Sequence, residues 1–378
     1  MQATDTEAKQ LKRTRVRRLR LALLACAGLA SAAIAHGATP DKRADTPGQM
    51  AIQVNADKLT LAVAKVPQIY LYGTIDAGAA DRFEALVRSG KVPVGSDVYL
   101  NSPGGDMRAG IALGRLFRAQ SIATHLGVPR KPSRSTTPTS KVAVCMDACT
   151  LAYMGGLFRW SPTGNDRFGA LPLRTQPGNA AQAPDDVDAY LKELNLTAEA
   201  QYGRKIQADP AVLTGDEMIN SGLANNGRLA PTVSYHMMGN APLLTLGQSA
   251  RDGQYRITLL CKPDGLTVTA YYMVGVERAR KLVSRATRSY FEIDNQQTLP
   301  GDRDAFSATS ESVMISRPVP FAQLPQFLAA RSVGAWLADR GGAVRYGFTI
   351  YLESVRNRLQ SYGDACAQMA KGSGATKR

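Results

Sequence analysis

Two short motifs near the middle of the chain contain the residues whose types and spacing could do chemistry. The first is Asn101-Ser-Pro-Gly-Gly105, whose glycines would let the backbone approach a bound ligand closely. The second is Cys145-Met-Asp-Ala-Cys149, which places the carboxyl group of Asp147 between two cysteines. A carboxylate can act as an acid, a base or a nucleophile, but it is a poor nucleophile toward an amide. The two motifs are therefore the candidate chemical site.

Together these motifs resemble those of the Clp protease proteolytic subunit, and most closely its exported bacterial relatives. The first motif is followed by Gly110 and by Leu113-Gly-Arg115 in the order of that family. In the exported relatives the second motif runs Cys-x-Ser-Ala-Cys, so Asp147 stands at the position of the serine nucleophile. The resemblance implies the α/β Clp/crotonase-like fold of stacked β-β-α units.

The resemblance also implies a role for each matching position. The N–H groups of Gly104 or Gly105, together with that of Ala148, would form an oxyanion hole. Leu171 occupies the position of the family histidine, so two of the three triad groups are missing. The acidic third group would lie just before Leu213, where we assign no residue.

Two interpretations of Asp147 stay open. As the N-cap of the following helix, its carboxylate would accept N–H bonds from the turn at Ala148 to Leu151. As a catalytic group, it would act as an acid, a base or a nucleophile, as carboxylates do in crotonase-type relatives. We expect no metal and no cofactor, because no paired metal-ligand spacing and no adenine-pocket signature is present. His125 and His236 are expected to be structural residues.

The first 35 residues have the layout of a secretory signal peptide. Seven basic residues precede an apolar run from Leu21 to Ala35, which is too short to span a bilayer comfortably. We expect cleavage after Ala35 or Gly37, and a periplasmic or secreted product.

The charge of the chain bears on its partners. Residues 1–35 carry seven Lys/Arg and two Asp/Glu, so their removal lowers the net charge from +15 to +10. A basic exported protein favours anionic envelope surfaces, whereas no recognition motif supports nucleic acid as a partner. An extended peptide, an envelope protein and further copies of the chain are the other expected partners.

Four cysteines follow the signal segment, and an even number in an exported chain suggests two disulfides. Four cysteines allow three connectivities. We expect Cys145 to pair with Cys149, provided that Cys145 lies on the incoming strand, and Cys261 to pair with Cys366.

Alternating strand and helix signals predict a parallel sheet over residues 50–230. This domain follows the signal peptide at 1–35 and a segment at 36–49 that we expect to be flexible. Within this part we expect a helix over 185–206. Residues 235–370 predict a smaller α+β C-terminal domain that begins with a hairpin over 255–272 and ends with a helix over 355–369. We expect 304–310 and the tail 371–378 to be mobile.

The joint loss of the serine and the histidine argues against a working serine peptidase. We therefore expect a pseudo-serine-peptidase of the cell envelope that binds or assembles without catalysis. The alternative is a hydrolase or acyl-transfer enzyme that uses Asp147 with an oxyanion hole at Gly104, Gly105 and Ala148.

Overall fold

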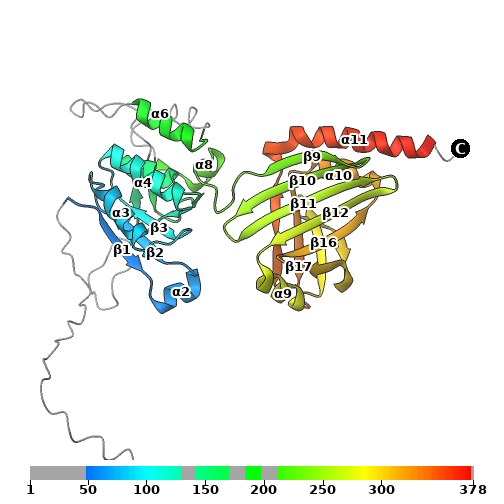
Figure 1. Cartoon of the computed structure of the whole chain (residues 1–378), viewed down its shortest axis with the longest axis horizontal. Coiled ribbons are helices and arrows are strands. Elements are labelled where there is room, and N and C mark those ends of the chain that lie inside the picture. Colours follow the sequence, from blue (N-terminus) through cyan, green and yellow to red (C-terminus); the bar gives the residue numbers. More distant parts are fainter. Residues whose placement is uncertain (1–47, 130–141, 170–183, 197–211, 376–378) are drawn as a thin grey trace, which may run out of the picture. The chain divides into compact units, whose positions relative to one another are not determined.

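The computed structural model describes residues 48–129, 142–169, 184–196 and 212–375. Contacts between Cα atoms divide the chain into two units, Met1–Thr46 and Pro47–Arg378, and every described residue belongs to the second. The architecture is mixed α/β (Figure 1).

The N-terminal part is built on a five-stranded sheet in which only the first strand runs antiparallel to its neighbour. Its strands, in spatial order, are β1 (Ala51–Asn55), β2 (Gln68–Tyr72), β3 (Asp97–Asn101), β4 (Ala123–Leu126) and β6 (Phe158–Arg159). A small second sheet consists of β5 (Val144–Cys145), β7 (Arg167–Gly169) and β8 (Val212–Leu213). Parallel strands joined through helices confirm the α/β reading of this region.

Helices cover one face of the larger sheet, because alternate strand residues turn their apolar side chains that way. Ile69 and Leu71 of β2 and Val98 and Leu100 of β3 are fully buried there. The helices of this part are α2 (Lys58–Ala64), α3 (Ala79–Arg88), α4 (Met107–Ala119), α5 (Ala148–Met154), α6 (Pro184–Glu193) and α8 (Gly215–Asn220).

Helices α4 and α5 cross at unusually close range, and this contact positions the candidate site. A Cβ atom on Gly110 of α4 would collide with the backbone carbonyl of Ala148. One on Gly155 would collide with the backbone of Gly114. Glycine is therefore required for the backbones to meet, and the start of α5 is held against the first turn of α4.

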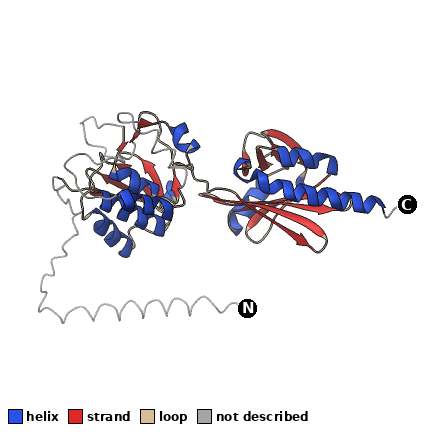
Figure 2. Ribbon diagram, turned by 90° about the horizontal axis from the view of Figure 1, so that it is seen from above, coloured by secondary structure: helices blue, strands red, loops and turns tan. Residues whose placement is uncertain are grey.

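The C-terminal part contains two antiparallel sheets. The larger has the order β15 (Phe306–Ala308), β16 (Ser312–Val319), β12 (Gly265–Met273), β11 (Gly253–Lys262), β10 (Ala241–Ala250) and β9 (Thr232–Met238). The smaller has the order β14 (Gln296–Gly301), β13 (Arg288–Ile293), β17 (Ser332–Ala338) and β18 (Arg345–Tyr351). Helix α11 (Arg356–Ala375) packs along β10 and β11 and ends at the C-terminus (Figure 2).

These two sheets contain an internal repeat that the sequence did not reveal. The run β12, α9 (Val276–Arg285), β13, β14 has the same order of elements as β16, α10 (Leu324–Ala329), β17, β18. Strand β12 pairs with β16, and β13 pairs with β17, so corresponding strands of the two runs lie side by side.

Two hydrophobic clusters form the core. One draws its fully buried residues from Met50 to Ala224, the other from Val233 to Cys366. The domain boundaries at 50–230 and 235–370 remain a prediction.

Three local expectations differ from the structure. The helix expected over 185–206 ends at Glu193, followed by Asn195 with a φ of 55°, and 197–211 lie outside the described residues. Strand β15 occupies part of 304–310 because Phe306 is buried and pairs with β16. Helix α11 runs five residues into the segment expected to be a tail.

Candidate functional site

Asp147 lies on a sharp turn between β5 and α5. Its backbone has φ 48° and ψ −120°, a conformation that costs a non-glycine residue energy. Hydrogen bonds on both sides hold the turn. Met146 N–H donates to the Ser102 carbonyl at 3.1 Å, and Thr150 donates to the Asp147 carbonyl through its N–H at 2.9 Å and its hydroxyl at 2.7 Å. The surrounding structure therefore imposes the strained backbone at this one carboxylate.

A cysteine pair brackets this turn. Cys145 lies on β5, as expected, and Cys149 lies in the first turn of α5. Their Cα atoms are 5.2 Å apart and the two sulfur atoms are at bonding distance, which is compatible with the predicted disulfide. The link constrains the residues on either side of Asp147.

The glycine turn lies directly against Asp147. Gly104 and Gly105 have φ angles of 122° and 137°. A Cβ on Gly104 would lie 2.9 Å from the Asp147 Cβ and 3.0 Å from its Oδ2, while a Cβ on Gly105 would collide with the Ile75 backbone. Both positions thus require glycine, and the tertiary structure brings the two sequence motifs together as expected.

The side chain of Asp147 does not cap helix α5. Asp147 occupies the N-cap position, but its carboxylate accepts no capping hydrogen bond from the helix. The N-cap interpretation is therefore wrong: at this φ and ψ the carboxylate points away from the first helical N–H groups and toward Gly104. Within the described segments, no hydrogen bond or ion pair to this carboxylate is found. Partial burial raises its pKa above 3.8.

The backbone donors near this carboxylate differ in their availability. Gly104 N–H donates to the Ser102 hydroxyl oxygen at 3.2 Å, so it is already engaged. The N–H groups of Gly105 and Ala148 have no hydrogen-bond partner among residues that the structure describes. Gly105 is exposed, whereas Gly104 and Ala148 are buried. The geometry therefore favours Gly105 over Gly104 as the donor on the turn.

No imidazole of the described chain approaches Asp147. Leu171, which we expect at the position of the Clp-type histidine, lies outside the described residues. The His125 ring on β4 is stacked between Tyr99 and Trp160, and His236 is exposed on the edge strand β9. The chain has three histidines, and the third, His36, lies in the undescribed N-terminal segment.

The second cysteine pair lies in the C-terminal part. Cys261 of β11 and Cys366 of α11 are both fully buried, with Cα atoms 5.8 Å apart and sulfur atoms at bonding distance. Both cysteine pairs are compatible with an oxidising compartment. None of the helices within the described ranges is long and apolar enough to cross a membrane. Nor do these ranges contain a group of three metal-ligating side chains that could hold an ion.

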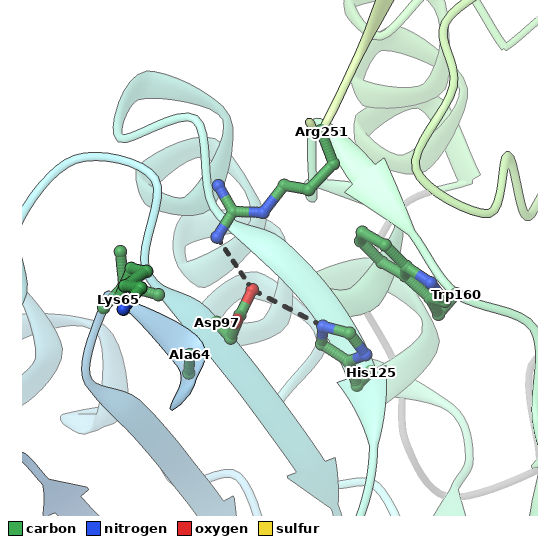
Figure 3. Close-up of a pocket in the computed structure, with 7 residues that line it drawn as sticks. Ala64, Lys65, Asp97, His125, Trp160 and Arg251 are labelled. Atoms are coloured by element: carbon green, nitrogen blue, oxygen red, sulfur yellow. Dashed lines mark hydrogen bonds and ion pairs between the residues drawn. The ribbon is translucent and has the colours of Figure 1, made fainter. Parts of the chain in front are cut away.

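A second cluster of polar and aromatic side chains, on the face of the larger sheet opposite Ile69 and Leu71, was missed by the sequence interpretation. Asp97, His125, Trp160 and Arg251 converge there on a hollow beside Lys65 (Figure 3). The signal available in the sequence was the alternation of Asp97 and Tyr99 on one strand with His125 on another. Only strand register could show that these residues are neighbours.

Comparison with known proteins gives distant structural neighbours only. No model of a protein family matches the chain, and no curated protein matches it. Two mutant forms of the 1510-N membrane-bound stomatin-specific protease are similar to 41% of this chain at 18% identity. Their TM-scores are 0.29 and 0.30, with 75% and 71% of those chains covered, and the second is a complex with a substrate peptide. ClpP1 from Listeria monocytogenes is similar to 42% of this chain at 14% identity, with a TM-score of 0.30 and 88% of its own length covered. At these values the likeness assigns no activity.

Proposed function

We propose that the turn at Asp147 is a peptide-binding site that does not hydrolyse the peptide it holds. One observation carries this proposal: the half-buried Asp147 carboxylate lies uncapped against the glycine turn. The backbone framework of the site is retained, while the chemical groups that a serine peptidase needs are not.

Electrostatics argues against amide hydrolysis at this turn. An oxyanion hole works by presenting positive N–H dipoles to the negative charge that develops in the transition state. A carboxylate beside Gly104 would repel that charge. The carboxylate is also a poor nucleophile toward an amide, and His125 and His236 are placed elsewhere. The site is therefore suited to holding a peptide bond rather than breaking it.

The same groups match the hydrogen-bonding pattern of an extended peptide. A peptide offers carbonyl oxygens and N–H groups in alternation, and recognition by backbone pairing uses both. The N–H group of Gly105 can donate to a carbonyl, and the Asp147 carboxylate can accept from an N–H or a basic side chain, whereas Ala148 is fully buried. Gly105 is exposed and has no side chain to obstruct the approach.

The test is peptide binding by the purified protein, measured by fluorescence polarisation with a library of labelled unstructured peptides. Asp147→Asn keeps the shape of the side chain but removes its charge, and should weaken binding about tenfold, which corresponds to about 1.4 kcal/mol. Asp264→Asn, in the exposed hairpin turn between β11 and β12, is the matched control and should bind as the wild type does. Cleavage of casein that disappears in Asp147→Ala would overturn the proposal.

The second candidate function is a hydrolase or acyl-transfer enzyme in which Asp147 is the reactive group. The observation that favours it is the raised pKa of an uncapped carboxylate, since perturbed groups concentrate at catalytic sites. Its oxyanion donors would be Gly105 and Ala148. Hydrolysis of activated esters by the wild type, abolished in Asp147→Asn and retained in Asp264→Asn, would establish it; equal rates in all three proteins would exclude it.

We further propose that the protein is exported, acts in the cell envelope and associates with itself. The two cysteine pairs, the basic charge and the leader-like first 35 residues support export. Mass determination of the protein recovered from the periplasm should give a chain that begins near residue 36. Analytical ultracentrifugation at tens of micromolar tests self-association, and a strict monomer would contradict it.

A further inference from the structure

A row of stacked rings crosses the face of the larger sheet opposite Ile69 and Leu71. Tyr70, Tyr99 and His125 are direct partners on the adjacent strands β2, β3 and β4, and Trp160 follows β6 beside them. Successive ring centroids lie 4.9, 4.7 and 4.5 Å apart, with nearly parallel planes. The row is thus a continuous aromatic stack that ends at His125 and Trp160.

A hollow of about 460 Å³ lies at that end of the row. Figure 3 shows His125 and Trp160 on one side of it, Ala64 and Lys65 on the other, and Asp97 and Arg251 between them. The volume lies in the range of small-molecule sites and is too small for a folded partner.

Positive charge exceeds negative charge among the residues that line this hollow. The Asp97 carboxylate accepts a hydrogen bond from Arg251 Nη2 at 3.0 Å, and this ion pair neutralises it. Lys65 lies at the rim, where its ammonium group donates to the Ala62 carbonyl at 2.7 Å and forms no ion pair with a carboxylate of the described segments. The lining therefore carries a net charge of about +1, counting His125 as neutral.

Hydrogen-bond donors are also available at the hollow. Arg251 Nη2 bonds Asp97 and the Gly95 carbonyl, while no partner of its Nε or Nη1 is found in the described part of the chain. His125 Nε2 is buried, has no hydrogen-bond partner there and lies 3.6 Å from the Asp97 Oδ1. Because Nε2 is buried beside Asp97, the donors that a ligand could reach are Nε and Nη1 of Arg251.

We propose that this hollow binds a small ligand that combines a flat ring with an anionic group. The ring would lie against Trp160 and the edge of His125, whose two faces are covered by Tyr99 and Trp160, since aromatic rings prefer offset-stacked or edge-to-face contacts. The anionic group would face Arg251 and Lys65, and the guanidinium fork suits a planar carboxylate. This site uses none of the residues around Asp147, so the proposal does not depend on the proposed peptide-binding function and is tested separately from it.

Three probes of similar size separate the components of this proposal. 4-Nitrobenzoate has the ring and the negative charge, benzamidine has the ring with a positive charge, and cyclohexanecarboxylate has the charge without the flat ring. We expect saturable binding of 4-nitrobenzoate by calorimetry, at least tenfold tighter than either of the others. Because the chain has two tryptophans, a Trp336→Phe background would assign any fluorescence quenching to Trp160.

Variants then place the binding in the hollow. Trp160→Leu and Lys65→Gln should each weaken 4-nitrobenzoate binding, the first about tenfold and the second several-fold. Arg285→Gln, an equal loss of charge on the outer side of α9, should leave it unchanged. Arg251→Gln should abolish binding. If this variant also has a lower melting temperature, its loss of binding could come from unfolding, and the effect of Lys65→Gln is then the test of the charge contribution. Any of three results would overturn the proposal. These are benzamidine binding as tight as that of 4-nitrobenzoate, no binding of 4-nitrobenzoate up to about 10 mM, and equal effects of the Lys65 and Arg285 variants.

Discussion

The Cβ and carboxylate of Asp147 fill the space in which a side chain at Gly104 would have to lie. A Cβ at position 104 would come within 2.9 Å of the Asp147 Cβ, closer than two such atoms can pack. The glycine of one motif and the carboxylate of the other are therefore a matched pair, although 43 positions separate them in the sequence.

Gly104→Ala should destabilise the protein by about 2–4 kcal/mol, because the new methyl group meets Asp147 and the φ of 122° disfavours any side chain. Gly90→Ala is the matched control. Gly90 also has a positive φ, 73°, but nothing lies within 4 Å of its added Cβ, so its cost should be about 1 kcal/mol. Urea denaturation measures both.

The same contact predicts coupling between the two positions. In an Asp147→Gly background the Cβ that Gly104→Ala would meet is gone, so the alanine should cost less there than in the wild type. A double-mutant cycle should give a coupling of about 1 kcal/mol or more. Additive effects would show that Asp147 and Gly104 do not pack as described.

Removal of the Asp147 charge should stabilise the protein at neutral pH. Burial raises the pKa of this carboxyl in the folded state above 3.8, so the folded protein binds the proton more tightly than the unfolded chain does. Stability from this group is then fully present below pH 3.8 and is lost as the pH rises through the folded pKa. Asp147→Asn should therefore exceed the wild type in stability at pH 7 and match it near pH 3. A less stable Asn variant at pH 7 would reveal a favourable partner for the carboxylate.

The two disulfides should contribute unequally. Cys261 and Cys366 are 105 residues apart, and removing that bridge by the double serine substitution should cost about 2–5 kcal/mol. Cys145 and Cys149 close a loop of only four residues, so their removal should cost less in global stability. Thermal unfolding of the two variants gives the comparison, and a larger loss for the short loop would contradict it.

Replacing Asp147 by serine alone should not create a peptidase. A serine on this turn still needs a neighbouring imidazole, and we expect Leu171 at the position where the Clp-type peptidases have one. Casein cleavage and labelling by a fluorophosphonate should both stay at background in Asp147→Ser. Activity in Asp147→Ser/Leu171→His, but not in the single variant, would show that the serine and the histidine of the triad are the missing groups. Activity in the single variant would contradict the assignment of Leu171.

The pattern of apolar and turn residues predicted an element correctly where its structure depends on residues that are close in the sequence. The hairpin predicted over 255–272 is present as the paired strands β11 and β12, because its two strands are neighbours in the sequence. The helix expected over 185–206 was too long, because the pattern indicated where it begins and gave no clear end. The internal repeat was not found in the sequence, because its two halves share the order of their elements and the pairing of their strands rather than a recognisable sequence motif.

At the candidate site, the sequence by itself determined which groups are present: two glycines in a turn, and a carboxylate with a cysteine on either side of it. Only the tertiary structure decided what that carboxylate does. A residue before a helix normally caps it, and the cap expectation followed from composition alone. The strained backbone at Asp147 turns the carboxylate toward Gly104 instead. This backbone conformation is held by contacts with other segments of the chain: the hydrogen bonds of Ser102 with the residues around β5, and the close crossing of α4 and α5. The hollow beside His125 and Trp160 likewise exists only through strand register, which brings together side chains from separate segments of the chain.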